Sequence, residues 1–290
     1  MARANIQEIQ DCILSIYKEI KTICDRHNVQ YFAIAGTAIG AVRHHGFIPW
    51  DDDLDIAMPA EDYHRFLTEY YKELPEHLQL IRPYASKNNS RQFLKVHDVR
   101  TTLIPEDNLT RPDLYYGIFV DIMPLYGIPK NAKFHNKHLY FLRSMDKLQR
   151  RDYAAYRQKG MPQAMLWLLA KPLNLLLPNL FWANRIEAYL NKFTMDNCTN
   201  TGCTWHLKFK RKEVFPVEWF SKSITMPFED TEIMISASFD ALLTQQFGDY
   251  MTPPPLDERI NHANEGIVNT GLSYLEYIKD FNQYGTVKQR

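Results

Sequence analysis

The chain has 290 residues, of which 45% are hydrophobic, and its 34 Lys and Arg balance its 34 Asp and Glu. This length can bury a substantial core, in one large domain or in two small ones. A formal net charge of zero argues against a protein that holds nucleic acid along its whole surface, so we expect no nucleic-acid partner. The 4 cysteines include no CxxC pair, which argues against a disulfide scaffold and a structural zinc site.

The N-terminal part of the chain predicts helices and strands in alternation. Isoleucines spaced three or four residues apart predict an amphipathic helix that ends near His27. The segment "YFAIAG" predicts a short buried strand ending at Gly36. The segment "TAIGAVRHH" predicts a short helix with Thr37 near its start, where the hydroxyl can cap free backbone amides. "LDIAM" predicts a strand that Pro59 stops, and "AEDYHRFLTEYYKEL" predicts an amphipathic helix.

The remainder predicts more strands, then helices, then a mixture. Strand patterns occur in "LQLIRP", "RQFLKVHDV", "TTLIPE" and "YYGIFVDIMPL", helical patterns from about 131 to 197, and short strands with helices after 205. We therefore expect an α+β fold, with a mixed sheet flanked by helices and a helical insertion. The expected parts are a catalytic core at 1–130, the insertion at 131–204, and a segment completing the core at 205–290.

One stretch, 164–182 ("AMLWLLAKPLNLLLPNLFW"), is strongly apolar. Lys171, Pro172 and Pro178 interrupt it, so no uninterrupted apolar run is long enough to cross a bilayer. Two interpretations stay open, a pair of buried helices or a face that rests on a membrane surface or acceptor. The N-terminus shows no apolar signal-peptide core, so we expect a cytoplasmic protein, with or without peripheral contact at the inner face of the membrane.

The segment 35–58, "AGTAIGAVRHHGFIPWDDDLDIAM", contains four aspartates within five positions. If the strand begins early, Asp51, Asp53 and Asp55 share one of its faces, and Asp53 and Asp55 form the surest pair. Two such carboxylates can bridge Mg²⁺ (or Mn²⁺), and Asp121, inside another apolar strand, is a natural third ligand. Asp53, Asp55 and Asp121 are therefore the predicted metal ligands and catalytic residues.

Four other interpretations of the acidic segment compete with a Mg²⁺ site. Apolar residues on both sides disfavour a solvated acidic loop, and the spacing lacks the glycine and glutamate of an EF-hand. A DDxxD motif of terpenoid synthases requires a helix, which Pro49 and the following strand pattern oppose. A DxD motif of nucleotide-sugar glycosyltransferases remains an alternative.

The residues around the aspartates predict an anion site beside the metal site. The turn at Gly36 and Thr37 opens a helix, whose amides can face phosphate. Arg43 and His44 can pair with phosphate oxygens, and Arg43 can do so with two donors.

Two further side chains have candidate roles in the same site. Lys95, on a predicted strand, is a candidate contact for donor phosphate. Trp50 either faces a quaternary ammonium through cation–π attraction or fixes the loop as a core residue.

These segments resemble the LicD family. The family signature of Gly-Thr, Gly-Ala-x-Arg-His and Gly-Phe-Ile-Pro-Trp-Asp-Asp-Asp is matched at 36–53, and "KVHDVRTTLI", "GIFVDIMPLYGIP" and "FGDYMTPPPLDERINH" resemble later blocks. The resemblance covers most of the chain and is weakest from about 133 to 197. One departure is Ser236-Ala237, where the family usually has a proline before its small residue.

The resemblance implies a DNA-polymerase-β-like nucleotidyltransferase core, as in fukutin and its relatives, with Gly36-Thr37, Asp53-Leu54-Asp55 and Asp121 in the superfamily's site positions. It implies an enzyme that moves phosphocholine, or a related phospho-alcohol, from a CDP-linked donor to a sugar hydroxyl of a surface glycan, with release of CMP. A lipid-linked acceptor would account for the apolar stretch 164–182. The family also gives Asp249, Arg259 and His262 structural or acceptor-side roles. The alternatives are a nucleotide-sugar glycosyltransferase and an inactive binding module with the same fold.

Overall fold

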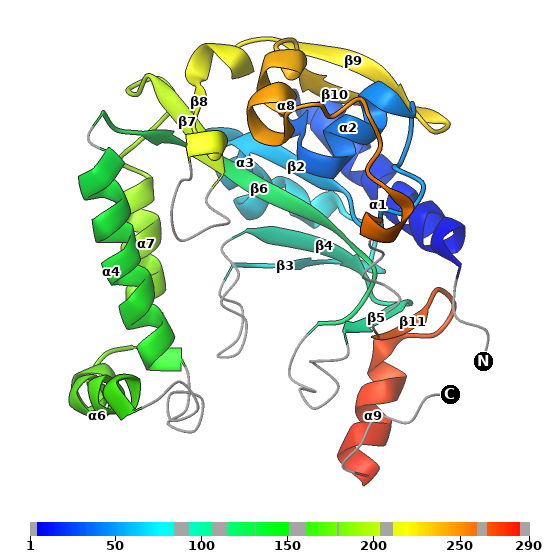
Figure 1. Cartoon of the computed structure of the whole chain (residues 1–290). Coiled ribbons are helices and arrows are strands. Elements are labelled where there is room, and N and C mark those ends of the chain that lie inside the picture. Colours follow the sequence, from blue (N-terminus) through cyan, green and yellow to red (C-terminus); the bar gives the residue numbers. More distant parts are fainter. Residues whose placement is uncertain are drawn as a thin grey trace. The chain divides into compact units, whose positions relative to one another are not determined.

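The structure is a computed structural model and describes residues 5–83, 93–105, 115–130, 132–150, 161–178, 180–203, 211–259 and 266–284. The chain divides into two compact units. The first unit is built from residues 1–82, 93–125 and 218–290, and the second from 83–92 and 126–217. Both units are drawn in Figure 1.

The first unit opens with helix α1 (Ile6–His27), which the isoleucine spacing predicted. The helix begins with a capping box, in which the side chain of Asn5 accepts from the backbone of Glu8 and the side chain of Glu8 accepts from the backbone of Asn5. It ends at Asn28, whose φ of 51° is left-handed. The isoleucine stripe is buried, at Ile9, Ile13, Ile16, Ile20 and Ile23.

A mixed sheet forms the centre of the first unit (Figure 1). Its strands are β1 (Phe32–Ala33), β2 (Asp55–Pro59), β3 (Leu78–Ile81), β4 (Leu94–Asp98) and β6 (Phe119–Ile128), which continues into the second unit. The strand order is β1-β2-β6-β4-β3, in which β2 and β6 are parallel and the other neighbours antiparallel. The parallel pairing sets Asp55 opposite Asp121, and the β4–β6 pairing sets Lys95 opposite Asp121. Three charged residues thus lie in one row across three strands.

Helices and a hairpin pack around this sheet. They are α2 (Ala35–Arg43), α3 (Ala60–Thr68), α8 (Phe239–Phe247), β9 (Ser223–Phe228) and β10 (Thr231–Ser236), with short 3₁₀ turns at Tyr70–Glu73, Val217–Phe220 and Leu256–Glu258. The hairpin contacts β1 and α2, and α8 contacts α2. Buried Tyr17 of α1 donates to the carbonyl of Glu232 at 2.8 Å, which fastens the hairpin to the first helix. The sequence had predicted most of these elements.

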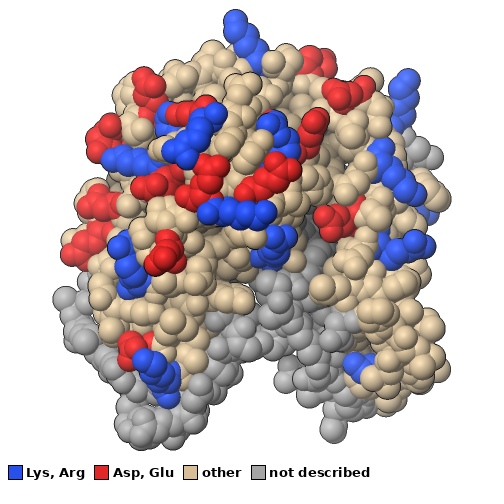
Figure 2. Space-filling model, turned by 180° about the vertical axis from the view of Figure 1, so that it is seen from behind, with Lys and Arg blue, Asp and Glu red and all other residues tan. Residues whose placement is uncertain are grey.

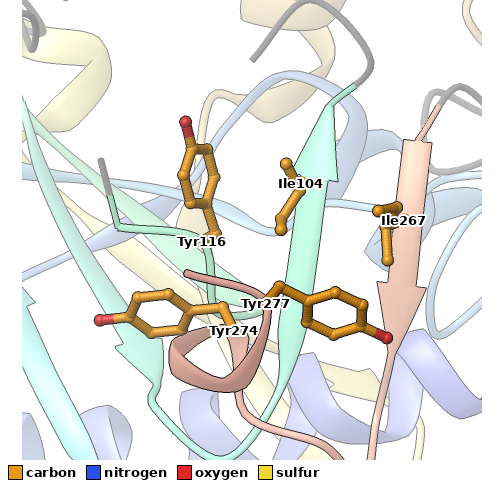
Figure 3. Close-up of a cluster of buried hydrophobic side chains, with 5 residues drawn as sticks. All are labelled: Ile104, Tyr116, Ile267, Tyr274 and Tyr277. Carbon is orange, nitrogen blue, oxygen red and sulfur yellow. The ribbon is translucent and has the colours of Figure 1, made fainter. Parts of the chain in front are cut away.

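A second small sheet carries the C-terminal helix of the first unit. It pairs β5 (Thr102–Pro105) with β11 (Gly266–Asn269), and α9 (Tyr274–Tyr284) packs against β5. Figure 3 shows the buried cluster that joins them, made of Ile104, Tyr116, Ile267, Tyr274 and Tyr277. The ring of Tyr274 also lies 5.7 Å from that of His97 in β4, so the cluster covers a fully buried histidine of the central sheet.

The second unit is mainly helical, as its sequence predicted. It contains α4 (Ala132–Arg150), α6 (Met161–Leu175), α7 (Phe181–Leu190), a 3₁₀ turn at Arg211–Glu213, and the strands β7 (Asn200–Cys203) and β8 (Phe215–Pro216). Helices α4 and α7 lie side by side (Figure 1), and α4 also contacts α6. Strand β7 pairs with β8 and with the end of β6, where Thr201 donates to the carbonyl of Tyr126 at 2.9 Å.

The interpretation of 164–182 as a pair of buried helices is wrong for most of that stretch. Apolar side chains of α6 are exposed, among them Leu169 at 73% and Leu175 at 73%, whereas Ala164 and Asn174 are buried. Among the described residues, no helix is both long enough and apolar enough to cross a membrane.

The expected α+β class is confirmed, and two local predictions need correction. Helix α2 begins at Ala35, two residues before Thr37, and no side chain caps it. Strand β2 begins only at Asp55, so Asp51 and Asp53 do not lie on a strand. One tertiary contact bears on both differences. The Thr37 hydroxyl, which the sequence placed as a helix cap, accepts instead from the backbone N–H of Asp55, the first residue of β2.

Figure 2 shows basic and acidic side chains interspersed over the described part of one face. Charges of opposite sign at such spacing largely cancel one another at a distance. The balanced formal charge is therefore also balanced locally on this face.

We expect His97 to limit the acid stability of the first unit. Burial lowers the pKa of His97 to about 4, and no polar partner contacts its ring nitrogens within the described residues. The unfolded chain binds the proton near the ordinary pKa of 6.5, so folding stability is lost as pH falls from about 6.5 toward 4.

His97→Gln should remove much of this acid sensitivity while lowering stability at neutral pH through changed packing. Urea unfolding of both proteins at several pH values between neutral and 4 measures the difference in slope. Parallel losses of unfolding free energy with acid in the two proteins would contradict the assignment.

Candidate active site

The site is centred on the row of charges across β2, β6 and β4. Asp55 and Asp121 are each 8% exposed and Lys95 is 5% exposed. The Nζ of Lys95 lies 2.6 Å from Oδ1 of Asp121 and 3.0 Å from the centroid of the Phe119 ring. Lys95, expected at the donor phosphate, thus forms a buried ion pair with a predicted metal ligand.

A tight strand-to-helix turn brings a further carboxylate to this row. Ala35, between β1 and the body of α2, has a φ of 49°, which is strained for a residue with a side chain. At the next position, a Cβ on Gly36 would lie 2.5 Å from Oδ2 of Asp51. Glycine at 36 therefore lets the Asp51 carboxylate lie directly on the turn.

Three contacts hold the acidic loop in this place. Buried Gln10 of α1 donates from Nε2 to the carbonyls of Ile48 at 3.1 Å and Asp51 at 2.8 Å. The hydroxyl of Thr37 accepts from the backbone N–H of Asp55 at 2.8 Å. Thr37 therefore joins α2 to the start of β2, and this contact replaces the capping role that the sequence predicted.

The start of the loop is held by the β9–β10 turn. The backbone N–H of Phe47 donates to Oε1 of Glu229 at 2.9 Å, and the Glu229 N–H donates to the carbonyl of His45 at 2.8 Å. A Cβ on Gly46 would overlap the Glu229 carboxylate, so a larger residue there would displace Glu229 from this contact.

The carboxylates repel one another strongly. Burial, with the neighbouring charges of Asp53 and Asp52, raises the pKa of Asp51 to about 8. Burial and the charges of Asp53, Asp121 and Asp51 raise the pKa of Asp55 well above its usual range. Both shifts favour the neutral form of the group more than in an isolated carboxyl, unless a positive charge joins the cluster.

Two guanidinium groups lie beside the acidic loop. Arg43 donates to the Tyr250 carbonyl at 2.6 Å and to Nε2 of His44 at 2.9 Å. Arg259 lies 4.4 Å from the centroid of the Trp50 ring and donates to the Pro254 carbonyl at 3.0 Å.

These groups also affect one another. Partial burial and the charge of Arg259 lower the pKa of Arg43, and partial burial and the charge of Arg43 lower the pKa of His44. Neither guanidinium forms an ion pair within the described residues. Two like charges near each other without a carboxylate form a place where an anion would be stabilised.

The donor chemistry of the cluster fits a hard divalent cation. Asp51, Asp53, Asp55 and Asp121 offer only oxygen atoms, and burial with the neighbouring carboxylates raises the pKa of Asp51 and of Asp55, an effect that a bound cation would oppose. However, in the described parts of the chain no three acidic, His or Cys side chains are gathered as a ready metal-ligand set. The metal therefore remains a proposal.

Comparison with known proteins addresses the resemblance directly. Residues 28–156 match the family described as "LicD/FKTN/FKRP, nucleotidyltransferase domain". The match contains the strand-to-helix turn, the acidic loop, Lys95 and Asp121. The chain carries a LicD-family domain. The resemblance stated from the sequence is thereby confirmed.

One relative extends this likeness over most of the chain, and others match parts of it. The lipopolysaccharide cholinephosphotransferase LicD of Haemophilus influenzae is 27% identical over 92% of this chain and 100% of the relative. An uncharacterized protein of Rickettsia prowazekii is 46% identical over 44% of this chain and 49% of its own length, and one of Caenorhabditis elegans is 35% identical over 26% and 20%. The expectation of a LicD-type enzyme agrees with the first of these relatives.

The structure brings Gly36, Thr37 and Asp55 together with Asp121 and Lys95. It places Asp51, which the sequence had suggested only as part of a longer strand, against Gly36, and it adds Gln10, which was not predicted. Nothing local in the sequence points to Gln10, whose hydrogen-bond partners lie 38 and 41 residues further along the chain. Arg259 had only a family-level role, and His262 lies outside the described residues.

We expect the metal-free protein to lose stability as pH rises. The pKa of Asp51 is about 8 when folded and near 3.8 when unfolded, so the folded chain binds the extra proton between these values. Its contribution to stability is therefore present below about 4 and lost as pH rises through about 8.

Asp51→Asn should flatten this part of the stability curve, because an amide has no proton to lose. Thermal unfolding in EDTA from pH 5 to pH 9 measures the effect, with the exposed Asp230→Asn as the matched control. A wild-type midpoint that rises through this range, or an unchanged slope in Asp51→Asn, would contradict the assignment.

Proposed function

We propose that the chain transfers phosphocholine, or a related phospho-alcohol, from a CDP-linked donor to a sugar hydroxyl of a surface glycan. The observation that carries the proposal is the pair of buried carboxylates, Asp55 and Asp121, set opposite each other on parallel strands beside the turn at Gly36. The likeness to a lipopolysaccharide cholinephosphotransferase over 92% of the chain supports this substrate class. The core is proposed to be of the DNA-polymerase-β type.

Asp53, Asp55 and Asp121 would hold Mg²⁺ or Mn²⁺, with Asp51 close enough to assist. Such a cation supplies charge neutralisation at the donor diphosphate and on the departing CMP. The protein contributes fixed carboxylates at the ends of two adjacent strands, and Lys95 orients the carboxylate of Asp121 through their ion pair. Such positioning would hold the donor phosphorus and the acceptor hydroxyl close together and correctly oriented for the reaction.

The transfer step uses few protein groups. The acceptor hydroxyl oxygen attacks the phosphorus that bears the alcohol, the bond from that phosphorus to the CMP oxygen breaks, and CMP leaves with the bonding electrons. Asp121 is the proposed acceptor of the hydroxyl proton. No covalent intermediate on a Ser or Cys is required.

The phosphates of the donor have candidate partners beside the carboxylates. Arg43 and Arg259, which lack an ion-pair partner among the described residues, offer planar donors suited to phosphate oxygens. His44 lies between Arg43 and Trp50, with its ring 6.4 Å from that of Trp50. The Trp50 ring already holds the Arg259 guanidinium, so a choline group would have to compete with Arg259 for it.

A glycosyltransferase that uses Asp53 and Asp55 as a DxD motif is the second candidate. The two functions differ in the nucleotide released, which is CMP in one case and a nucleoside diphosphate in the other. An inactive binding module would release neither. The acceptor is proposed to be lipid-linked, and the compartment to be the cytoplasm at the inner face of the membrane.

Asp55→Asn should reduce CMP formation by about a hundredfold or more, because it removes charge where the donor diphosphate is neutralised. The variant should fold, since an uncharged amide avoids both the cost of burying a charge and the repulsion, which together raise the pKa of Asp55. Phosphorus NMR of reactions with CDP-choline, Mg²⁺ and lipopolysaccharide measures both CMP and the transferred group.

Asp230→Asn is the control, because Asp230 is an exposed residue of the β9–β10 turn that pairs with Lys18. Near wild-type turnover in Asp55→Asn would refute the assigned site. Release of UDP from UDP-glucose, without CMP from CDP-choline, would favour the glycosyltransferase.

A further inference from the structure

The second unit presents an apolar helix face to solvent. Seven large apolar side chains of α6 are between 53% and 75% exposed, namely Met161, Met165, Leu166, Leu168, Leu169, Leu173 and Leu175. Leu176, just beyond the helix, is 83% exposed. Soluble proteins rarely leave so continuous an apolar surface uncovered.

The exposed side chains share one side of the helix. Met161, Met165, Leu169 and Leu173 recur every four residues, which places them on one face, and Leu166 and Leu168 lie on its flanks. We name this surface of seven side chains the α6 face. The opposite side carries Ala164 and Asn174, which are both buried.

Polar groups of this region are turned toward the body of the second unit. Asn174 accepts from the indole N–H of Trp182 at 2.9 Å, and the Trp182 ring lies 6.2 Å from that of Phe141 on α4. The helix is therefore held by its polar side while its apolar side faces outward. This arrangement is the reverse of a helix that packs its apolar side on a protein core.

We infer that the α6 face binds the surface of a phospholipid bilayer. Its side chains would enter the boundary between headgroups and acyl chains, with the helix lying in the plane of the membrane. No helix in the described residues is suited to span the bilayer, so contact at the surface is the mode that fits.

The charges near the face suit anionic headgroups. From 161 to 186 the sequence has no Asp or Glu, whereas Lys171 and Arg185 are basic. The Lys171 ammonium lies 5.2 Å from the centroid of the Trp167 ring, and a lysine beside a tryptophan is a common pair at membrane interfaces. Basic residues at a membrane surface are attracted to anionic lipid.

The same charges disfavour a second copy of the chain as the occupant. A two-fold symmetric contact through this segment would add the Lys171 and Arg185 of the second copy, with no Asp or Glu from 161 to 186 to pair with them. The seven side chains of the face also offer no hydrogen-bonding groups, which protein interfaces usually contain and a bilayer does not require.

The test is cosedimentation of the full chain with vesicles of phosphatidylcholine and phosphatidylglycerol. The double variant Leu169→Gln/Leu173→Gln should bind at least about tenfold more weakly, because each buried leucine contributes more than a factor of ten in the partition constant. Both residues are exposed, so the fold should survive, as circular dichroism and the thermal midpoint can verify.

Leu275→Gln is the matched control, an exposed leucine of α9 in the first unit, and should bind like the wild type. A wild-type chain that stays in solution with these vesicles would overturn the proposal. So would a wild-type dimer that Leu169→Gln/Leu173→Gln converts to monomer while vesicle binding is unchanged. The proposal is independent of the catalytic assignment, because Asp55→Asn should bind vesicles normally.

Discussion

The arrangement of the candidate site in the first unit depends on one constraint, which is the repulsion between carboxylates held close together on and beside adjacent strands. The β2–β6 pairing sets Asp55 against Asp121, and the turn at Gly36 places Asp51 beside them. Within the sheet, Lys95 forms an ion pair with Asp121. The pKa of Asp51 and the pKa of Asp55 nevertheless stay raised. A fold that gives up stability for this arrangement has carboxylates placed where the proposed cation would relieve their repulsion.

The surroundings of the cluster explain how such a site persists. Gln10 and Glu229 fix the two ends of the acidic loop from α1 and from the β9–β10 turn, and Thr37 fixes the start of β2. These contacts come from segments far apart in the sequence, so the loop is positioned by the whole first unit. The strained backbone at Ala35 is consistent with this, since strain persists only where the surroundings determine the conformation.

Much of the fold could be predicted, because periodic patterns report local structure. The isoleucine stripe predicted α1, the apolar runs predicted β2 and β6 with Asp121 inside, and the apolar pattern predicted the helices of the second unit. The density of aspartates predicted the location of the site. What sequence spacing could not supply was the tertiary role of Thr37, and the position of Asp51 against Gly36. The prediction of buried helices at 164–182 failed for a different reason. Apolar composition favours burial on average, but it does not say whether the side chains are covered by protein or by lipid.

The central claim is that the carboxylate cluster recruits a cation which in turn binds a CDP-linked donor. Thermal unfolding with CDP-choline, CDP-ethanolamine, CDP-ribitol, CTP and UDP-glucose, each with and without Mg²⁺, tests it most directly. A ligand present at a hundred times its Kd stabilises the native state by about 2.7 kcal/mol, which raises the midpoint clearly. The account predicts a rise that requires Mg²⁺ and is confined to CDP-linked compounds, and a rise with UDP-glucose alone or with none of them would contradict it.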